Sequence, residues 1–116
     1  MRAAIRAIAL AGIAAGAAIG AVSRPACAQE TGEQLVEAAR CNACHLMSEP
    51  LLGPPYIAIA ARHAARREVM IDVLALRIVN GGGGNWGIVP MVPNQWVSLD
   101  DARVMAQWIL NLSPAP

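Results

Sequence analysis

The order of apolar and polar residues divides the chain into a leader and a small helical domain. The first residues carry two arginines, an apolar run follows from Ala7 to Val22, and the segment ends in small residues at Ala28. This layout is typical of a secretory signal peptide, and the run is too short and too rich in Ala and Gly for a membrane span. We therefore predict a signal peptide over residues 1–28, removed by cleavage, and one domain over residues 29–116 that has no membrane anchor.

Helical periodicity predicts about four short helices in this domain and no strands. Thr31 and Gln34 have the spacing of a capping box, so the first helix is expected over residues 32–40. Residues 48–55 are expected to form a loop, because prolines punctuate them. A second helix is expected over residues 56–63, with two inward-facing residues, Ile57 and Ile59.

The second half of the domain contains two further predicted helices around a long loop. One covers residues 68–79, stops at Asn80-Gly81, and has the apolar residues Val69, Val73, Leu74 and Leu76. The other begins at the N-cap Ser98, with Asp101 at the capping-box position, and runs to Pro114 with four apolar residues on its buried face, Ala102, Met105, Ile109 and Leu112. Between them, residues 81–95 are rich in glycine and lack periodicity. Long structured loops in small domains are usually functional.

Size and charge narrow the classes of function. The predicted mature domain has 88 residues and no Phe, so a disulfide, a metal or a large apolar cofactor is expected to complete its core. Three of the nine basic residues leave with the leader, so six arginines face eight acidic residues, a formal charge of −2. This balance argues against nucleic acid as a partner. No Lys is available for a lysine-rich docking surface.

The motif Cys41-Asn42-Ala43-Cys44-His45 carries the clearest chemistry. Two thiols three residues apart lie on one side of a helical turn, so both can bond to one porphyrin edge while the next residue, His45, reaches the iron. Zinc would need four ligands, and only His63, distant in sequence, is available as the fourth. A thioredoxin-like redox pair would need a βαβ unit, and two such close cysteines are not a disulfide framework. The motif predicts one covalently attached haem.

The second axial ligand of such an iron is expected to be a methionine. Met47 is only two residues from His45 and cannot cross to the other face of the ring. Met70 and Met105 lie in helical stripes, where Met is usually core filler. Met91 lies in irregular backbone between Pro90 and Pro93, so we predict that His45 and Met91 are the iron ligands.

Several motifs together resemble the short bacterial class I cytochromes c. They are Cys41-x-x-Cys44-His45, Gly53-Pro54, Asn80-Gly81, Trp86-Gly87, Pro90-Met91-x-Pro93-Asn94 and Trp108 in the last helix. The resemblance covers nearly all of the predicted mature domain. It implies an all-α class I cytochrome c fold, with about four short helices around one covalent haem c.

The resemblance also implies roles for four further residues. In that family the carbonyl of the residue matching Pro54 accepts the Nδ1 proton of the haem histidine. The residue matching Asn94 hydrogen-bonds the methionine sulfur, and those matching Arg77 and Trp86 donate to a haem propionate. The absence of Lys, and Trp96 beside the last helix, depart from the family and leave the docking face undetermined.

Two other residues have simpler interpretations. His63, near three arginines, is expected to be a solvated surface residue, and Trp108 is expected to pack against the haem. With both axial positions filled and no nucleophile–base set, the sequence predicts no enzyme. It predicts a monomeric periplasmic one-electron carrier between redox partner proteins of a respiratory chain, with an uncharged apolar rim around Met91. The alternatives are the electron-accepting cytochrome subunit of a periplasmic dehydrogenase, and a ligand-binding or peroxidatic haem protein.

Overall fold

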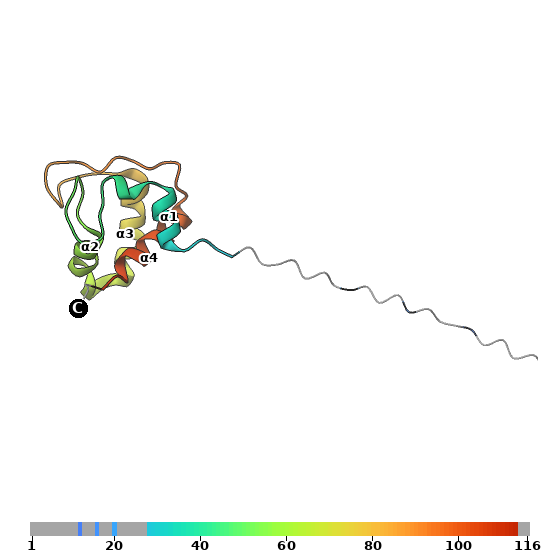
Figure 1. Ribbon diagram of the computed structural model, residues 1–116. Coiled ribbons are helices and arrows are strands. Elements are labelled where there is room, and N and C mark those ends of the chain that lie inside the picture. Colours follow the sequence, from blue (N-terminus) through green and yellow to red (C-terminus); the bar gives the residue numbers. More distant parts are fainter. Residues whose placement is uncertain (1–11, 13–15, 17–19, 21–27, 114–116) are drawn as a thin grey trace, which may run out of the picture.

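The computed structural model describes residues 28–113 together with Gly12, Gly16 and Gly20, so nearly all of the predicted leader lies outside the described residues. The helices are α1 (Gly32–Ala38), α2 (Tyr56–Arg62), α3 (Arg67–Asn80) and α4 (Leu99–Leu110). Two 3₁₀ turns, η1 (Cys41–Ala43) and η2 (Ala64–Arg66), follow α1 and α2 (Figure 1). The described residues form no strand, which confirms the predicted all-α fold with four short helices. None of the described helices is long and apolar enough to cross a membrane.

The N-termini of α1 and α4 are capped as their sequences predict. The Gln34 amide donates to Thr31 Oγ1 at 3.2 Å, and the Thr31 amide donates to Gln34 Oε1 at 2.9 Å. At α4 the Asp101 amide donates to Ser98 Oγ at 3.0 Å. These bonds satisfy backbone donors that have no partner inside the helix. The first helix ends at Ala38, two residues before the predicted end, because Arg40 takes a left-handed conformation with φ of 60°.

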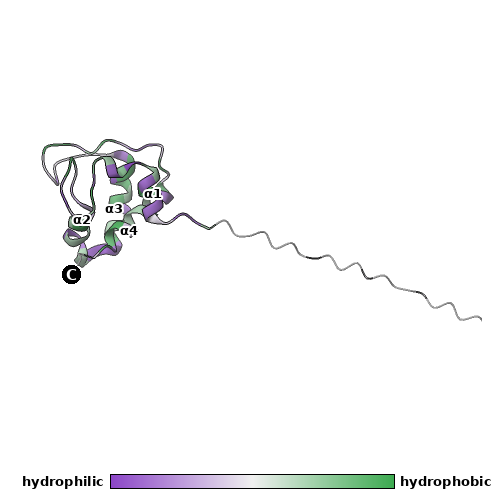
Figure 2. Ribbon diagram, in the orientation of Figure 1, coloured by the Kyte–Doolittle hydropathy of each residue, from purple (hydrophilic) through white to green (hydrophobic). Residues whose placement is uncertain are grey.

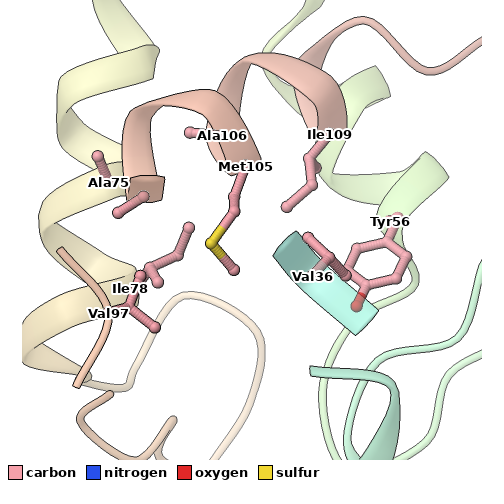
Figure 3. Packing of buried hydrophobic residues seen from close by; sticks show 9 residues of the cluster. Val36, Tyr56, Ala75, Ile78, Val97, Met105, Ala106 and Ile109 are labelled. Carbon is pink, nitrogen blue, oxygen red and sulfur yellow. The ribbon is translucent and has the colours of Figure 1, made fainter. Parts of the chain in front are cut away.

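The core of the domain surrounds α4, which packs most extensively against α3, then against α1 and α2. Apolar residues are concentrated on α3 and α4, whereas α1 is mainly hydrophilic (Figure 2). Figure 3 shows Met105 of α4 in the middle of the cluster, between Ile78 of α3 and Val36 of α1. The buried members of the cluster are Val36, Tyr56, Ala75, Ile78, Val97, Ala102, Met105, Ala106 and Ile109.

Gly32 allows α1 and α4 to approach closely. A Cβ added at this position would collide with the Cβ of Trp108 and with the Val104 carbonyl oxygen of α4. Trp108 is therefore held between α1 and α2, with its ring edge on Tyr56 at a centroid distance of 5.6 Å.

The inward faces of α2 and α3 were predicted only in part, because Ile59 and Leu74 pack against the core cluster and the other predicted residues do not. In α2 the buried residues are Tyr56 and Ala60, whereas Ile57 and Ile59 are only half-buried. In α3 the buried residues are Met70, Ala75 and Ile78, while three of the four predicted apolar positions, Val69, Val73 and Leu76, are exposed. Both helices carry apolar residues on more than one face, so periodicity alone did not identify the face that α4 covers. In α4 the prediction holds for Ala102, Met105 and Ile109, and Leu112 is half-buried.

Residues 81–97 cross from the end of α3 to the start of α4 as an ordered loop. Two residues within it, Gly82 and Met91, form an isolated antiparallel bridge, in which each donates its amide to the other's carbonyl, at 2.9 and 2.7 Å. The Asn94 amide is shared between the Ile78 and Val79 carbonyls at 3.2 and 3.1 Å. The loop is thereby fixed to the end of α3.

Candidate functional site

The described residues enclose a cavity of about 640 Å³ between η1, the three helices α2, α3 and α4, and the loop 82–96. Its lining includes all eight residues predicted as site residues: Cys41, Cys44, His45, Pro54, Arg77, Trp86, Met91 and Asn94. Cofactor sites usually have volumes of roughly 300 to 1,000 Å³. The fold thus brings residues that are distant in sequence to one cavity of a size suited to a cofactor.

The two cysteines lie on one 3₁₀ turn. Residues three apart eclipse each other in a 3₁₀ helix, so Cys41 and Cys44 are on the same side of the chain. The Cys44 and His45 amides both donate to the Cys41 carbonyl, at 3.1 and 3.0 Å. Both thiols are free and half-buried, and burial raises the pKa of the Cys41 thiol. The turn therefore presents both thiols to the cavity beside the His45 ring.

The His45 ring is buried and oriented by three neighbours. Its Nδ1 lies 2.7 Å from the Pro54 carbonyl oxygen, so the predicted hydrogen bond is present. A carbonyl oxygen only accepts, so Nδ1 carries the proton and the lone pair of the neutral ring is on Nε2. Tyr56 stacks on the ring at a centroid distance of 5.6 Å, and a Cβ at Gly53 would overlap the imidazole. The lone pair of Nε2 is thus available to bind a metal.

Three methionines line the cavity, Met70, Met91 and Met105, whereas Met47 lines a separate hollow of about 400 Å³ beside Glu33 and Trp108. Met105 is 1% exposed inside the aliphatic cluster and Met70 is 8% exposed on α3, as expected of core residues. Met91 differs from both, because its backbone is held by Gly82 in the loop and its side chain joins no helix face.

Asn94 does not make the predicted bond to the Met91 sulfur. Its Nδ2 donates to the Ile78 carbonyl at 3.0 Å and to the Val92 carbonyl at 3.2 Å, which uses both amide hydrogens. The competing acceptors are backbone oxygens, and the one at the end of α3, that of Ile78, also accepts from the Asn94 backbone amide. Asn94 therefore holds the segment after Met91 against α3 and positions Met91 through the backbone.

Arg77 and Trp86 both lie at the cavity, each held by a neighbour. Arg77 Nη1 donates to the Gly81 carbonyl at 3.4 Å, and its guanidinium packs on Gly82. Trp86 is 44% exposed, and the Arg62 guanidinium lies 4.6 Å above its ring centroid. Arg62 also donates to the Asn85 carbonyl at 2.8 Å. Arg62 thus ties the end of α2 to the glycine-rich loop, a link between residues 23 apart in sequence that sequence patterns did not predict.

His63 is buried, so the expectation of a solvated residue is wrong. It is 7% exposed, it lines the cavity, and its Nδ1 is buried with no hydrogen-bond partner. Burial and the charges of Arg66 and Arg62 lower its pKa. Its spacing from Tyr56 and Ala60, seven and three residues, places it on the buried face of α2, and this periodicity is the signal that would have identified it.

Trp108 does not line the main cavity, contrary to its predicted place against the cofactor. The close packing of α1 on α4 at Gly32 places its ring beside Tyr56 and the smaller hollow.

The chemistry of the cavity fits a haem and does not fit zinc. Among the described residues no three of His, Cys, Asp or Glu come together as a metal site. The charged side chains at the cavity are arginines, with none of the described Asp or Glu residues in its lining. Two thiols, an imidazole, apolar walls and several cations suit a flat apolar ring that carries an iron and two carboxylates.

Known proteins resemble this chain along most of its length. No family model matches it. Cytochrome c-551 of Azotobacter vinelandii is 41% identical over 81 residues, which cover 70% of this chain and 96% of that protein. Cytochrome c-552 of Hydrogenobacter thermophilus is 42% identical over 80 residues, 69% of this chain and 80% of that protein. The chain belongs to the cytochrome c-551/c-552 family.

A solved structure of this family supports the same assignment. The crystal structure of wild-type Nitrosomonas europaea cytochrome c552 matches with a TM-score of 0.64 at 38% identity, covering 67% of this chain and 95% of that one. The predicted class I cytochrome c fold is confirmed. Members of the family are small electron carriers with one covalently bound haem c. This cytochrome is therefore a monohaem electron carrier.

Proposed function

We propose that this cytochrome is a periplasmic carrier that moves one electron at a time between redox partner proteins of a respiratory chain. The observation that carries the proposal is the cavity itself. Cys41, Cys44, His45 and Met91 line it together, and the Pro54 carbonyl directs the lone pair of His45 onto Nε2.

Four side chains hold the haem in this proposal. Cys41 and Cys44 would form the thioether bonds, and His45 Nε2 and the Met91 sulfur would bind the iron. A bound haem supplies the Fe(III)/Fe(II) couple, and thioether ligation raises its potential. Arg77 and Trp86 would bind its carboxylates, while Pro54 orients the His45 ring and Asn94 positions Met91 through the backbone. With His45 and Met91 both bound to it, the iron would have no position left for a substrate.

Partners dock on an apolar rim beside the cavity, formed by Ile88, Val89 and Val92. These side chains are 99, 56 and 64% exposed, and Val89 and Val92 also line the cavity. An exposed apolar patch of this kind suits a small and brief contact, as electron-transfer partners make. The periplasmic location rests on the leader pattern of residues 1–28.

Haem attachment is tested by acid–acetone extraction and by mass measurement of the mature protein. We expect the colour to stay with the polypeptide and the mass to include one haem. Release of the colour into the organic layer would contradict the thioether bonds. Cys41→Ser together with Cys44→Ser removes both attachment points, and we expect a colourless, largely unfolded chain.

Met91 is tested against the other two cavity-lining methionines. We expect Met91→Ala to abolish the weak far-red absorption of methionine-bound ferric haem, lower the potential and open the iron to cyanide. Met70→Leu and Met105→Leu are matched controls that keep apolar volume, and both should retain the band. Loss of the band in either control, with retention in Met91→Ala, would assign the ligand to that residue.

Gel filtration of the native periplasmic extract, followed by haem absorbance, separates a free carrier from an enzyme subunit. We expect elution as a monomer, and Val92→Glu should slow electron exchange with the physiological partner while leaving the absorption spectrum unchanged. Haem that elutes with a larger dehydrogenase would establish the subunit alternative instead.

A further inference from the structure

Arg40 has an unusual backbone conformation for an arginine. It connects α1 to η1 with φ of 60° and ψ of 29°, and it is the only residue other than glycine with a positive φ in the described part of the chain. Its amide donates to the Glu37 carbonyl at 3.0 Å and its carbonyl accepts from the Ala43 amide at 3.1 Å, so the turn requires this conformation. Glycine usually occupies such a position after a helix, because a side chain there is strained. The arginine is thus present at a cost in stability.

Contacts of the Arg40 side chain within the protein do not offset this cost. The ion pairs among residues 28–113 involve only Arg103, and the arginine side chains that donate hydrogen bonds there are those of Arg62, Arg77 and Arg103. Arg40 is exposed, and its guanidinium has no partner among these residues. Strained residues are concentrated at functional sites. Contact with another molecule would therefore explain why an arginine stands here.

Arg40 lies at the edge of the cavity that carries the cysteines. It precedes Cys41, and both line the cavity together with two exposed residues, Ala43 and Leu52. In a haem, the two positions that bind thiols and the two carboxylates are on opposite edges of the ring. Because the proposed site assigns Arg77 to the carboxylates, the charge of Arg40 is left for a molecule that approaches this edge from outside.

We propose that the Arg40 guanidinium binds a carboxylate of the redox partner and so fixes the partner at the edge of the haem that carries the thioether bonds. The proposal rests on the carrier function proposed above. A planar guanidinium donates two parallel hydrogen bonds to a carboxylate, which gives both attraction and orientation. None of the described Asp or Glu residues lines the cavity to compete for this contact. The contact makes and breaks no covalent bond, and one electron passes from the partner's redox centre to the iron as Fe(III) becomes Fe(II).

Opposite effects on stability and on electron transfer distinguish this role from a structural one. Arg40→Gln removes the charge and keeps the strain, whereas Arg40→Gly removes both. We expect the urea midpoint of the holoprotein to stay unchanged in Arg40→Gln and to rise in Arg40→Gly, while both variants accept electrons from the partner more slowly. A midpoint in Arg40→Gly no higher than in Arg40→Gln would show that the conformation is unstrained, and it would overturn the proposal.

Flavin semiquinones, generated by flash photolysis, probe the charge at the edge where electrons enter. Flavin mononucleotide carries an anionic phosphate, and lumiflavin is neutral. At low ionic strength we expect flavin mononucleotide to reduce the wild type faster than Arg40→Gln, and lumiflavin to reduce both at the same rate. Arg67→Gln is the matched control, because it removes an equal charge from an exposed arginine that does not line the cavity. Equal slowing in the two variants would assign the effect to net charge and overturn the proposal.

Recognition of the partner is measured as the rate at which native periplasmic and membrane fractions reduce the ferric protein. At low salt we expect this rate to fall about tenfold in Arg40→Gln, as for the loss of one hydrogen-bonded charge. The rates should converge at about 1 M salt, where the Debye length is about 3 Å. Arg40→Lys keeps the charge without the planar fork, so its rate should lie between the two. Equal rates for the wild type and Arg40→Gln at low salt would overturn the proposal.

A lipid phosphate is the competing anion, so the wild type and Arg40→Gln are also sedimented with phosphatidylglycerol vesicles at low salt. We expect neither to bind. Binding of the wild type that is lost in Arg40→Gln would assign the guanidinium to a membrane surface and overturn the proposal. Each sample is first checked for covalent haem and the far-red band. A wild type that lacks these contradicts the proposed function, whereas one that has them but reacts at the same rate as Arg40→Gln contradicts only the role of Arg40.

Discussion

Around α4, aliphatic side chains from three helices are buried directly against one another, whereas residues 81–97 bury only Asn94 and Val97. The helical region encloses its own core, and Met105 is 1% exposed there. The loop region has little core and is fixed by a few polar links: the Gly82–Met91 bridge, the bonds of Asn94 and the contacts of Arg62. The two sides of the cavity are therefore stabilised in different ways. Burial stabilises the helical side, and individual hydrogen bonds determine the position of the side that carries Met91.

Met105→Ala should have the largest effect on stability, because it removes a fully buried side chain from the helical side. We expect the free energy of unfolding of the holoprotein to fall by about 2–5 kcal/mol, measured by urea titration at neutral pH. The far-red band should persist, since Met91 is held from the loop. A loss below about 1 kcal/mol would mean that the cluster collapses into the space or is looser than its burial indicates.

Asn94→Ala should have the opposite balance of effects. It should lower the overall stability less than Met105→Ala and disturb the loop that carries Met91 more. The Val92 carbonyl loses its side-chain donor, and the Ile78 carbonyl keeps only the backbone amide of residue 94, so we expect a loss of about 1–3 kcal/mol. The far-red band should weaken, and the loop amides should exchange faster with solvent deuterium, while α4 amides remain protected. Asn94→Asp is the matched control, because it keeps the shape and removes the donor. Uniformly faster exchange in α4 would show that the two regions unfold together.

Tyr56 contacts both regions, so its titration reports on their junction. Its hydroxyl donates to Asn42 Oδ1 at 3.0 Å, and burial, with the nearby Cys41 and Cys44, raises its pKa. Folding therefore favours the neutral phenol of Tyr56. Its contribution to the free energy of unfolding is complete below the ordinary tyrosine pKa of about 10 and is lost as the pH rises above that value. Tyr56→Phe should lower stability by about 1 kcal/mol at neutral pH and make it less sensitive to alkali.

Urea unfolding of the two proteins from neutral to alkaline pH gives this comparison. The chain has one Tyr and no Lys, so few other side chains titrate in the alkaline range. Parallel alkaline losses in the wild type and in Tyr56→Phe would assign the effect to another group.

Arg62→Gln should have the smallest effect on stability, because it removes an exposed contact from the loop side. A cation–π contact at an exposed site contributes about 0.5–1 kcal/mol. We expect little change in the unfolding midpoint but faster amide exchange around Asn85 and Trp86. Arg67→Gln is the control, since Arg67 is also an exposed arginine and makes none of these contacts. Equal exchange rates in the two variants would leave Arg62 without a role in holding the loop.

Local signals in the sequence predicted much of this fold. Thr31, Ser98 and Gly81 mark helix ends through bonds to neighbours within a few residues, so they can be identified without a structure. The Cys41–His45 motif is equally local. The inward faces of α2 and α3 were predicted less well, because both helices have apolar residues on several sides and only the position of α4 selects among them.

The site was predicted as a set of residues more successfully than as a set of contacts. All eight predicted residues line one cavity, but Asn94 binds the Ile78 and Val92 carbonyls instead of sulfur. The burial of His63 could have been predicted from its spacing to Tyr56 and Ala60, whereas the link from Arg62 to Asn85 depends on segments that meet only in three dimensions. Interactions of this kind leave no spacing pattern in the sequence, because the partners lie on different elements.

The bridge between Gly82 and Met91 also bears on how the loop can vary during evolution. Both ends of residues 83–90 are closed by paired backbone bonds, and Ile88, near the tip, is 99% exposed. Extra residues beside Ile88 would lengthen a loop whose ends are already joined by the Gly82–Met91 bridge. The entropic cost of closing a loop grows only slowly with its length. Insertions and deletions at this tip should therefore accumulate among descendants without displacing Met91, and the same place should accept an engineered peptide tag.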